Sequence, residues 1–173
     1  RKNRMNKRKE KIKMIFDFDS TFIRLEALDE LAGIALENHE NKKKILAEIV
    51  KTTKLGMEGK ISFPESLARR FKLLSANKKH LPALISHLKK NVSQSVRKNR
   101  KFFKNNHSDI YIISGGFEEY IHPVVKDFGI RRSNIISNGF IFGRGGKIIG
   151  FDKKRTLAEK NGKAKAVRDK KIQ

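Results

Sequence analysis

The stretch Met14-Ile15-Phe16-Asp17-Phe18-Asp19-Ser20-Thr21 decides the fold, because an apolar run leads directly into two carboxylates. A short apolar segment that ends in turn-forming residues is typical of a buried strand in a parallel sheet. Asp17 and Asp19 would then lie at the carboxyl end of that strand, where open α/β sheets bind their ligands. Residues two apart in a strand point the same way, so both carboxylates can face one small volume. Two adjacent carboxylates suit a metal-assisted site with a nucleophile and a proton donor, although Asp and Ser at a strand end also serve as turn and cap residues.

Length and composition indicate one globular domain, or a core with a small insert. The chain has 173 residues, of which 38% are hydrophobic, and it contains no cysteine. The lack of cysteine excludes a disulfide framework and a thiolate metal site. No apolar run is long enough to span a bilayer, and no signal-peptide core follows the basic start. We therefore expect a cytoplasmic protein that does not enter membranes.

The net charge of +23 is typical of a protein that binds polyanions. The excess is mostly lysine spread over predicted helix surfaces, with few aromatic residues between the lysines. The densest cluster, residues 1–13, precedes the first strand and is predicted to be a basic tail or linker. We expect weak, salt-sensitive association with anions rather than specific nucleic-acid binding.

Hydrophobic periodicity predicts four helices directly after the first strand. Ser62, with Pro64 and Glu65 after it, is expected to start the third helix through a capping box. No strand pattern interrupts the region up to Asn91, so the helices form an insert that is predicted to be a lid. The predicted helices span about 25–36, 45–55, 62–74 and 79–90.

The pattern after the insert predicts the rest of an α/β core. A helix over 96–104 leads to a second buried strand over 109–113, which ends in Ser114-Gly115-Gly116. The pattern then predicts a helix over 117–128, a third strand near 134–137, a hairpin over 139–151 and a helix from 157 to 167 that is interrupted at Asn161-Gly162. A parallel sheet of three strands that ends on an uncovered helix is an unfinished α/β fold.

Two further motifs suit phosphate chemistry. Ser114-Gly115-Gly116 places a hydroxyl and a flexible backbone before a helix, where N–H groups and the helix dipole favour an anion. Lys163 lies at a helix start, where the dipole disfavours a cation, and it could offset an anionic site instead. Taken singly, local turn geometry explains the first motif, and the abundance of lysine explains the second.

The order and spacing of these motifs resemble the phosphoserine phosphatase family of the haloacid-dehalogenase superfamily. The resemblance covers nearly the whole chain, from about residue 13 to residue 167. Its lid motifs are the specific part, because catalytic motifs are shared across the superfamily while lid residues follow the substrate. The matching residues are Phe16-Asp17-Phe18-Asp19-Ser20-Thr21, Glu26, Asp29-Glu30, Gly56-Met57-Glu58-Gly59-Lys60, Phe63, Ser66-Leu67, Arg70, Ser114-Gly115-Gly116-Phe117, Asn138 and Asn161-Gly162-Lys163.

The resemblance implies a three-layer, Rossmann-like α/β core with a helical cap inserted after the first strand, C-terminally incomplete. The core would comprise 14–24 and 92–173, the cap 25–91, and the tail 1–13. The family's last motif, a strand followed by Gly-Asp-Gly-x-x-Asp that supplies a metal carboxylate, is absent. Asp169 is the only acid after Lys163, no hydrophobic strand precedes it, and we do not assign it that role. The chain is then either a fragment of a longer protein or a natural truncation. The resemblance also implies that such a domain can be fused behind a phosphoglycerate dehydrogenase, in which case residues 1–13 would be a linker remnant.

The resemblance also implies Mg²⁺-dependent hydrolysis of O-phosphoserine to serine and phosphate, in L-serine biosynthesis. Asp17 would be the nucleophile that forms an aspartyl-phosphate, and Asp19 the general acid and base. Mg²⁺ would bind the Asp17 carboxylate and the Asp19 backbone carbonyl, with the remaining carboxylate ligand not in this chain. Ser114 and the Gly115 N–H would hold phosphate oxygens, and Lys163 would balance charge.

In the cap, the resemblance implies that Glu26 meets the substrate's ammonium group and Arg70 its carboxylate, while Met57 and Phe63 form an apolar wall. Taken singly, Glu26 and Arg70 could be surface charges, and Met57 and Phe63 could be core residues. A zwitterionic phosphate ester, however, needs a negatively and a positively charged side chain in the same site. Two alternatives remain: a phosphatase of the same superfamily for another small phosphate ester, and a catalytically inactive basic module that binds nucleic acid or a partner. Without the last motif, we expect weak Mg²⁺ binding and little activity from this chain. The sequence does not predict an oligomeric state.

Overall fold

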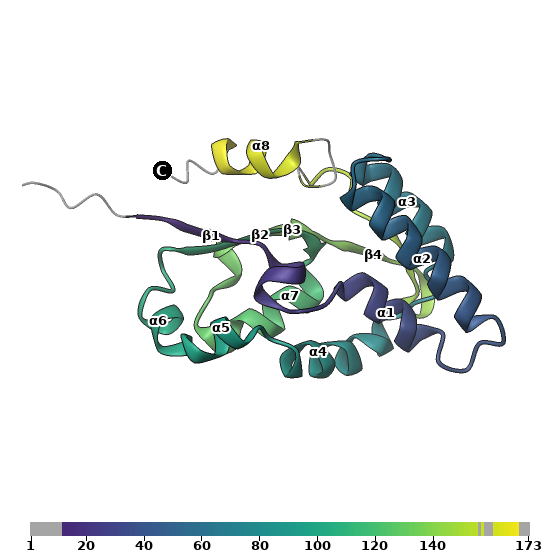
Figure 1. Ribbon diagram of the computed structural model, residues 1–173, viewed down its shortest axis with the longest axis horizontal. Coiled ribbons are helices and arrows are strands. Elements are labelled where there is room, and N and C mark those ends of the chain that lie inside the picture. The colour runs from purple at the N-terminus through teal and green to yellow at the C-terminus, as the bar shows by residue number, and fades with distance from the viewer. Residues whose placement is uncertain (1–11, 156, 158–160, 170–173) are drawn as a thin grey trace, which may run out of the picture.

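The computed structural model describes residues 12–155, 157 and 161–169, and its centre is a parallel three-stranded sheet (Figure 1). The strand order is β1-β2-β3, with Ile15 beside Tyr111 and Ile112 beside Ile135. Because all three strands run the same way, their carboxyl ends meet at one edge of the sheet. The strands are β1 (Met14–Phe16), β2 (Ile110–Phe117) and β3 (Ile135–Asn138).

Helices cover both faces of the sheet, so the core has three layers (Figure 1). On one face, Ile113 packs with Leu157 and Ala166 beneath α8. On the other face, Ile110 and Ile112 belong to the main hydrophobic core. Burial on both faces explains why β2 reads as a continuous apolar run rather than an alternating one. The helices of these layers are α5 (Gln94–Lys98), α6 (Arg100–Asn105), α7 (Glu118–Val125) and α8 (Gly162–Asp169), with short helical turns at Lys126–Phe128 and Arg132–Asn134.

Four helices follow β1 and a tight turn at Phe18–Phe22. In Figure 1, α1 to α3 stand together beyond one end of the sheet, whereas α4 runs below it. There α4 packs against α7, so the last helix of the predicted insert lies against the core, and the boundary of the cap stays a prediction. The four helices are α1 (Ala27–Ala35), α2 (Lys42–Met57), α3 (Phe63–Leu73) and α4 (Leu81–Lys90), the last preceded by a short turn at Lys78–His80.

Helix α3 begins through half of the predicted capping box. The Ser62 hydroxyl accepts a hydrogen bond from the Glu65 backbone N–H at 3.3 Å, and Pro64 occupies the first turn. The Glu65 carboxylate pairs with Arg69 one turn later, at 2.7 Å, instead of returning to the cap. An i,i+4 ion pair on the helix surface has therefore replaced the second bond of the box.

An antiparallel hairpin connects the core to the cap region. It consists of β4 (Phe140–Phe142) and β5 (Ile148–Phe151), joined by a turn at Arg144–Gly146. The Ile148 N–H donates to the Ala76 carbonyl at 3.0 Å, and the Asn77 side chain donates to the Gly145 carbonyl at 2.8 Å. The hairpin therefore holds the segment that follows α3.

The α/β fold class that the sequence predicted is confirmed, with two local corrections. The single helix predicted over 96–104 is two short helices that meet at Asn99. The second strand does not end at Ile113 but continues to Phe117, which pairs with Asn138, so Ser114-Gly115-Gly116 belongs to an irregular strand end. The start predicted for the last helix falls partly outside the described residues, and α8 begins at Gly162. None of the helices in the described ranges is both long and apolar enough to cross a membrane.

Candidate active site

The loop after β1 carries the two aspartates into a cavity. The Asp17 carboxylate accepts a hydrogen bond from the Phe18 backbone N–H at 2.8 Å and so caps the turn that begins there. Phe18 and Phe22 are fully buried and anchor this turn in the core. Ser20 has a φ of +53°, a left-handed conformation that lets the chain reverse sharply behind Asp19. Buried rings on one side therefore fix a short loop whose carboxylates lie on the other.

Asp17 is paired with the lysine that the sequence singled out. The Lys163 ammonium, in the first turn of α8, donates to the second carboxylate oxygen of Asp17. The side chains are 39% exposed for Asp17 and 54% for Lys163, so the pair is open to a ligand. The contact brings together the first strand and the last described helix.

Asp19 is the most perturbed acid of the loop. Its carboxylate accepts a hydrogen bond from the Ala27 N–H at 2.9 Å, at the start of α1. Burial raises the pKa of Asp19 to about 7, the Ala27 N–H opposes this rise, and the nearby charges of Glu26 and Asp17 add to it. A carboxyl group with a pKa near 7 can both give and accept a proton at neutral pH.

The end of β2, at Ser114-Gly115-Gly116, lines the cavity beside these acids, and we call these three residues the floor of the cavity. Ser114 is 1% exposed, and its hydroxyl oxygen accepts a hydrogen bond from the Gly116 N–H at 3.0 Å. The Asn138 side chain donates to the Gly115 carbonyl at 2.8 Å and ties β3 to this floor. The hydroxyl proton of Ser114 remains available for a ligand oxygen.

Both glycines of this floor are required by close neighbours. A methyl group at Gly115 would lie 2.7 Å from the Phe63 ring, which reaches down from the start of α3. A methyl group at Gly116 would lie 2.8 Å from the Tyr120 hydroxyl and 3.1 Å from a carboxylate oxygen of Asp19. Real Cβ atoms essentially never show separations below 3.0 Å, so a side chain at either position would displace Phe63 or Tyr120.

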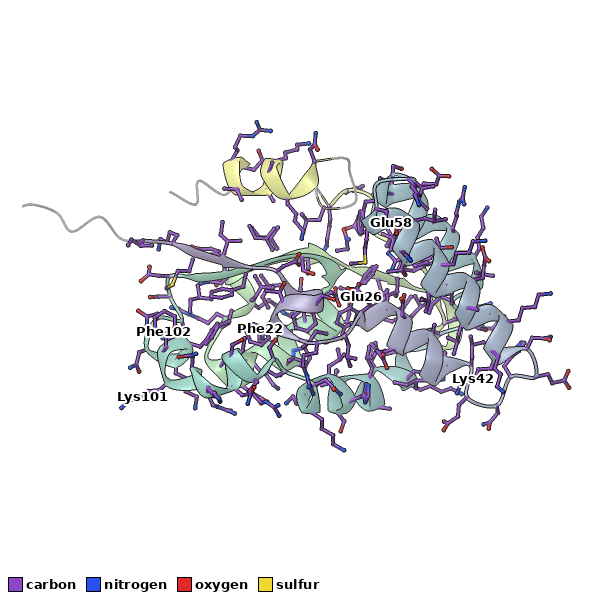
Figure 2. The ribbon with its side chains drawn as sticks, viewed as in Figure 1. Phe22, Glu26, Lys42, Glu58, Lys101 and Phe102 are labelled. Carbon is purple, nitrogen blue, oxygen red and sulfur yellow. The ribbon has the colours of Figure 1, made fainter. Side chains whose placement is uncertain are left out.

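Glu26 is held at the junction between the aspartate loop and α1 (Figure 2). Its carboxylate accepts a hydrogen bond from the Ser20 hydroxyl at 2.7 Å. Burial raises the pKa of Glu26, while the Ser20 hydrogen bond opposes the rise. A positive charge that entered the cavity would relieve this cost of burial.

Arg70 is buried, with 7% of the residue exposed, and it is partly paired. One guanidinium nitrogen lies 3.6 Å from the Asp29 carboxylate, which also accepts a hydrogen bond from the Thr53 hydroxyl at 2.9 Å. The Arg70 Nε has no hydrogen-bond partner among the described residues. Asp29 therefore orients the guanidinium and leaves one donor free.

A cavity of about 370 Å³ brings every predicted site residue together. The sequence motifs assigned nine of its lining residues: Asp17, Asp19, Glu26, Met57, Phe63, Arg70, Ser114, Gly115 and Lys163. Met57 is 69% exposed and lies at the rim. The sequence did not assign the other lining residues, which are Ser20, Thr21, Leu28, Leu67, Gly116, Phe117 and Tyr120. Of these, Tyr120 lies in the apolar pattern of α7, which is typical of a core residue, so no local signal marked it as a site residue.

A larger cavity of about 600 Å³ adjoins this one near the start of α8. It shares Phe63, Gly115 and Lys163 with the first cavity, but neither aspartate lines it. Because both aspartates line the smaller cavity, the chemistry belongs there.

The smaller cavity offers oxygen ligands for a hard cation. The Asp17 carboxylate and the Asp19 backbone carbonyl are the kind of donors that Mg²⁺ takes, and both belong to one short loop. Within the described residues, no group of three or more acidic or histidine side chains is placed to hold a metal. The donor chemistry therefore fits Mg²⁺, with only a partial set of protein ligands.

A parallel sheet with two aspartates after its first strand, a polar end on its second and a lysine on a later helix is the arrangement that the resemblance to the haloacid-dehalogenase superfamily implied. No family model matches the chain. The sequence is 35% identical over 152 residues to the chloroplastic phosphoserine phosphatase of Arabidopsis thaliana, which covers 88% of this chain and 49% of that protein. It is 29% identical over 169 residues to the phosphoserine phosphatase of Methanocaldococcus jannaschii, covering 92% of this chain and 74% of that protein.

Solved structures agree with these sequence relatives. A phosphoserine phosphohydrolase-like protein from Francisella tularensis has a TM-score of 0.80 at 29% identity, covering 92% of this chain and 72% of that one. A phospho-aspartyl intermediate analogue of a phosphoserine phosphatase has a TM-score of 0.72 at 26% identity, covering 95% and 75%. The chain is therefore a relative of the phosphoserine phosphatases within the haloacid-dehalogenase superfamily. It spans 49% of the Arabidopsis relative and 64% of the mouse one.

Proposed function

We propose that this chain carries the site of a phosphoserine phosphatase, which hydrolyses O-phosphoserine to serine and phosphate with Mg²⁺ as the final step of L-serine biosynthesis. One observation carries the proposal. A single cavity contains two aspartates, one with a pKa near 7, a polar strand end, a lysine, and one acidic and one basic side chain from the predicted cap. Relatives named as phosphoserine phosphatases support it.

Asp17 and Asp19 would divide the chemistry between them. A carboxylate oxygen of Asp17 attacks phosphorus, and the bond from phosphorus to the serine oxygen breaks as Asp19 gives its proton to that oxygen. The product is an aspartyl-phosphate on Asp17. Asp19, now ionised, takes a proton from a water molecule, which attacks phosphorus, frees the Asp17 carboxylate and yields inorganic phosphate.

The phosphoryl group would be held by the floor and by Lys163. The Ser114 hydroxyl and the Gly115 N–H donate to its oxygens, and the ammonium of Lys163 offsets the negative charge shared with Asp17. Mg²⁺ bound to the Asp17 carboxylate and the Asp19 carbonyl would add further positive charge beside the phosphate.

The predicted cap would read the amino-acid part of the substrate. Glu26 carries a half-buried carboxylate that an ammonium group would stabilise. Arg70 is oriented by Asp29 and can donate to a carboxylate. Phe63 closes over Gly115 and excludes water from the phosphate.

The test compares phosphate release and ligand binding in three proteins. With Mg²⁺, the wild-type chain should release phosphate from O-phosphoserine slowly, because the last metal carboxylate is not in this chain. Asp17→Asn should abolish that release, since an amide cannot act as the nucleophile. Glu26→Gln should raise the KM for O-phosphoserine about tenfold or more, because it removes the charge opposite the ammonium group, and should leave the hydrolysis of glycerol phosphate unchanged.

The binding of O-phosphoserine, measured by calorimetry, gives a second readout that does not depend on turnover. If Glu26→Gln left both the KM and the affinity for O-phosphoserine unchanged while Asp17→Asn abolished activity, the substrate would be another small phosphate ester. If the wild-type chain neither bound nor hydrolysed any phosphate ester, the enzymatic proposal itself would fail.

A further inference from the structure

Tyr120 places a second free hydrogen-bond donor in the active-site cavity. The residue lies in the first turn of α7 and is fully buried, with 0% of its surface exposed. Its hydroxyl has no hydrogen-bond partner among the described residues, and the same is true of the Arg70 Nε. Both residues line the 370 Å³ cavity. The site therefore holds two buried donors that the protein itself does not satisfy.

The position of the Tyr120 hydroxyl is fixed by the rings around it. The Tyr120 ring lies 6.0 to 6.1 Å, between centroids, from those of Phe18, Phe117 and Phe140. Aromatic packing on several sides keeps the ring from turning its oxygen elsewhere. The hydroxyl therefore stays above Gly116, 2.8 Å from where a methyl group on that residue would lie.

The hydroxyl is a proton donor under all ordinary conditions. Burial raises the pKa of Tyr120 well above its usual range, and the nearby negative charge of Asp19 raises it further. A buried donor without an acceptor destabilises a protein, and a phenylalanine ring would fill the same space without that cost. A hydroxyl retained at the floor of a cavity is explained by a ligand that accepts its hydrogen bond.

The proposed substrate leaves one acidic group for these donors. Its phosphoryl group belongs with Asp17 and Lys163, and its ammonium group with Glu26, so its carboxylate remains. A carboxylate has only acceptor atoms, which matches a guanidinium and a hydroxyl donor in one cavity. We propose that Tyr120 is a further substrate-binding residue, whose hydroxyl donates a hydrogen bond to the substrate carboxylate beside Arg70. This inference rests on the proposed function.

The experiment uses two ligands that differ in this carboxylate alone. O-phosphoserine and O-phosphoethanolamine are titrated calorimetrically, in metal-free buffer, into the wild-type chain, Tyr120→Phe and Tyr111→Phe. Tyr120→Phe should weaken O-phosphoserine binding about tenfold or more, as expected for a hydrogen bond to a charged group, and should leave O-phosphoethanolamine binding unchanged. Tyr111→Phe is the matched control, because Tyr111 lies on β2 outside the cavity lining and should change neither affinity.

Thermal unfolding separates this role from a structural one. Tyr120→Phe should melt at the same temperature as the wild type or higher, because it removes a hydroxyl that nothing in the described structure satisfies. Equal loss of affinity for both ligands would overturn the inference, because the hydroxyl would then act on the phosphate, on Asp19 or on the fold. Unchanged O-phosphoserine affinity in Tyr120→Phe would also overturn it, while leaving the proposed function intact. If the wild-type chain did not bind O-phosphoserine, the proposed substrate would fail and this inference with it.

Discussion

Asp19 is placed where its ionisation opposes folding. Burial raises its pKa to about 7 in the folded chain, while the unfolded value is about 3.9. Below pH 4 the group is neutral in both states, so it costs nothing. Between pH 4 and pH 7 the unfolded chain releases the proton and the folded chain keeps it, so the free energy of unfolding falls as pH rises. Above pH 7 the carboxylate is ionised in both states, and the folded chain bears the full cost of burying that charge.

Asp19→Asn should therefore stabilise the metal-free protein at pH 8 and give no such gain at pH 4. The asparagine oxygen can still accept the Ala27 N–H, and the penalty that disappears is at most about 4 kcal/mol, less where cavity water solvates the carboxylate. Urea unfolding of both proteins at pH 4, 6 and 8 measures the difference. A gain of the same size at every pH would show that Asp19 ionisation is not its source.

The order of motifs along the chain could predict some site residues, whereas others are identified only by their contacts in the structure. Asp17, Asp19 and Lys163 could be assigned because motif order along the chain carries the information. Tyr120 could not, because a tyrosine in an apolar helix pattern is ordinarily a core residue. The pairing of Arg70 with Asp29 was also missed, since it joins two helices that no local pattern relates.

At the level of elements, the start of α3 contacts the end of β2 where the Phe63 ring packs on Gly115. A methyl group at Gly115 would lie 2.7 Å from the Phe63 ring, so Gly115→Ala should push the ring and α3 away from the phosphate floor. Small displacements of binding groups are costly, and we expect O-phosphoserine affinity to fall about 10- to 100-fold. Calorimetric titration measures the loss.

Two further variants control for this effect. Gly33→Ala lies on α1, where an added methyl group meets nothing within 4 Å, and should leave binding unchanged. Adding Phe63→Leu to Gly115→Ala should recover part of the lost affinity by removing the clash. If the double variant bound no better than Gly115→Ala alone, the contact with Phe63 would not be the cause.

The elements themselves followed largely from periodicity, and the errors came from non-local pairing. The strands, the hairpin and the four helices after β1 appear where the apolar patterns indicated. The extension of β2 to Phe117 was missed because its partner, Asn138, is contributed by another strand. Ser114-Gly115-Gly116 has the composition of a turn, and only the neighbouring strand makes it part of a sheet.

At the scale of the whole molecule, the net charge of +23 determines how the protein interacts with polyanions. The charge is spread over helix surfaces, and Lys101, for example, is exposed and projects away from the fold (Figure 2). Such a surface attracts phosphate backbones without reading their sequence.

The chain should bind duplex DNA at about 50 mM salt and release it as salt rises, losing roughly 10³-fold or more in affinity by 200 mM if six or more phosphates are contacted. Fluorescence anisotropy with two unrelated sequences measures both the salt slope and any preference. Asp17→Asn serves as the control, because it should change DNA binding little. Binding that persisted at high salt or favoured one sequence would support the basic-module alternative.

The contact between Asp17 and Lys163 also orders events in time, because it joins residues that are 146 positions apart in the chain. At about 5–20 residues per second, a ribosome adds Lys163 roughly 7 to 30 seconds after Asp17. During that interval the nascent chain has its acids but not the cation that offsets them. Synthesis from one end therefore delays assembly of the phosphate site until Lys163 has been added, 146 positions after Asp17.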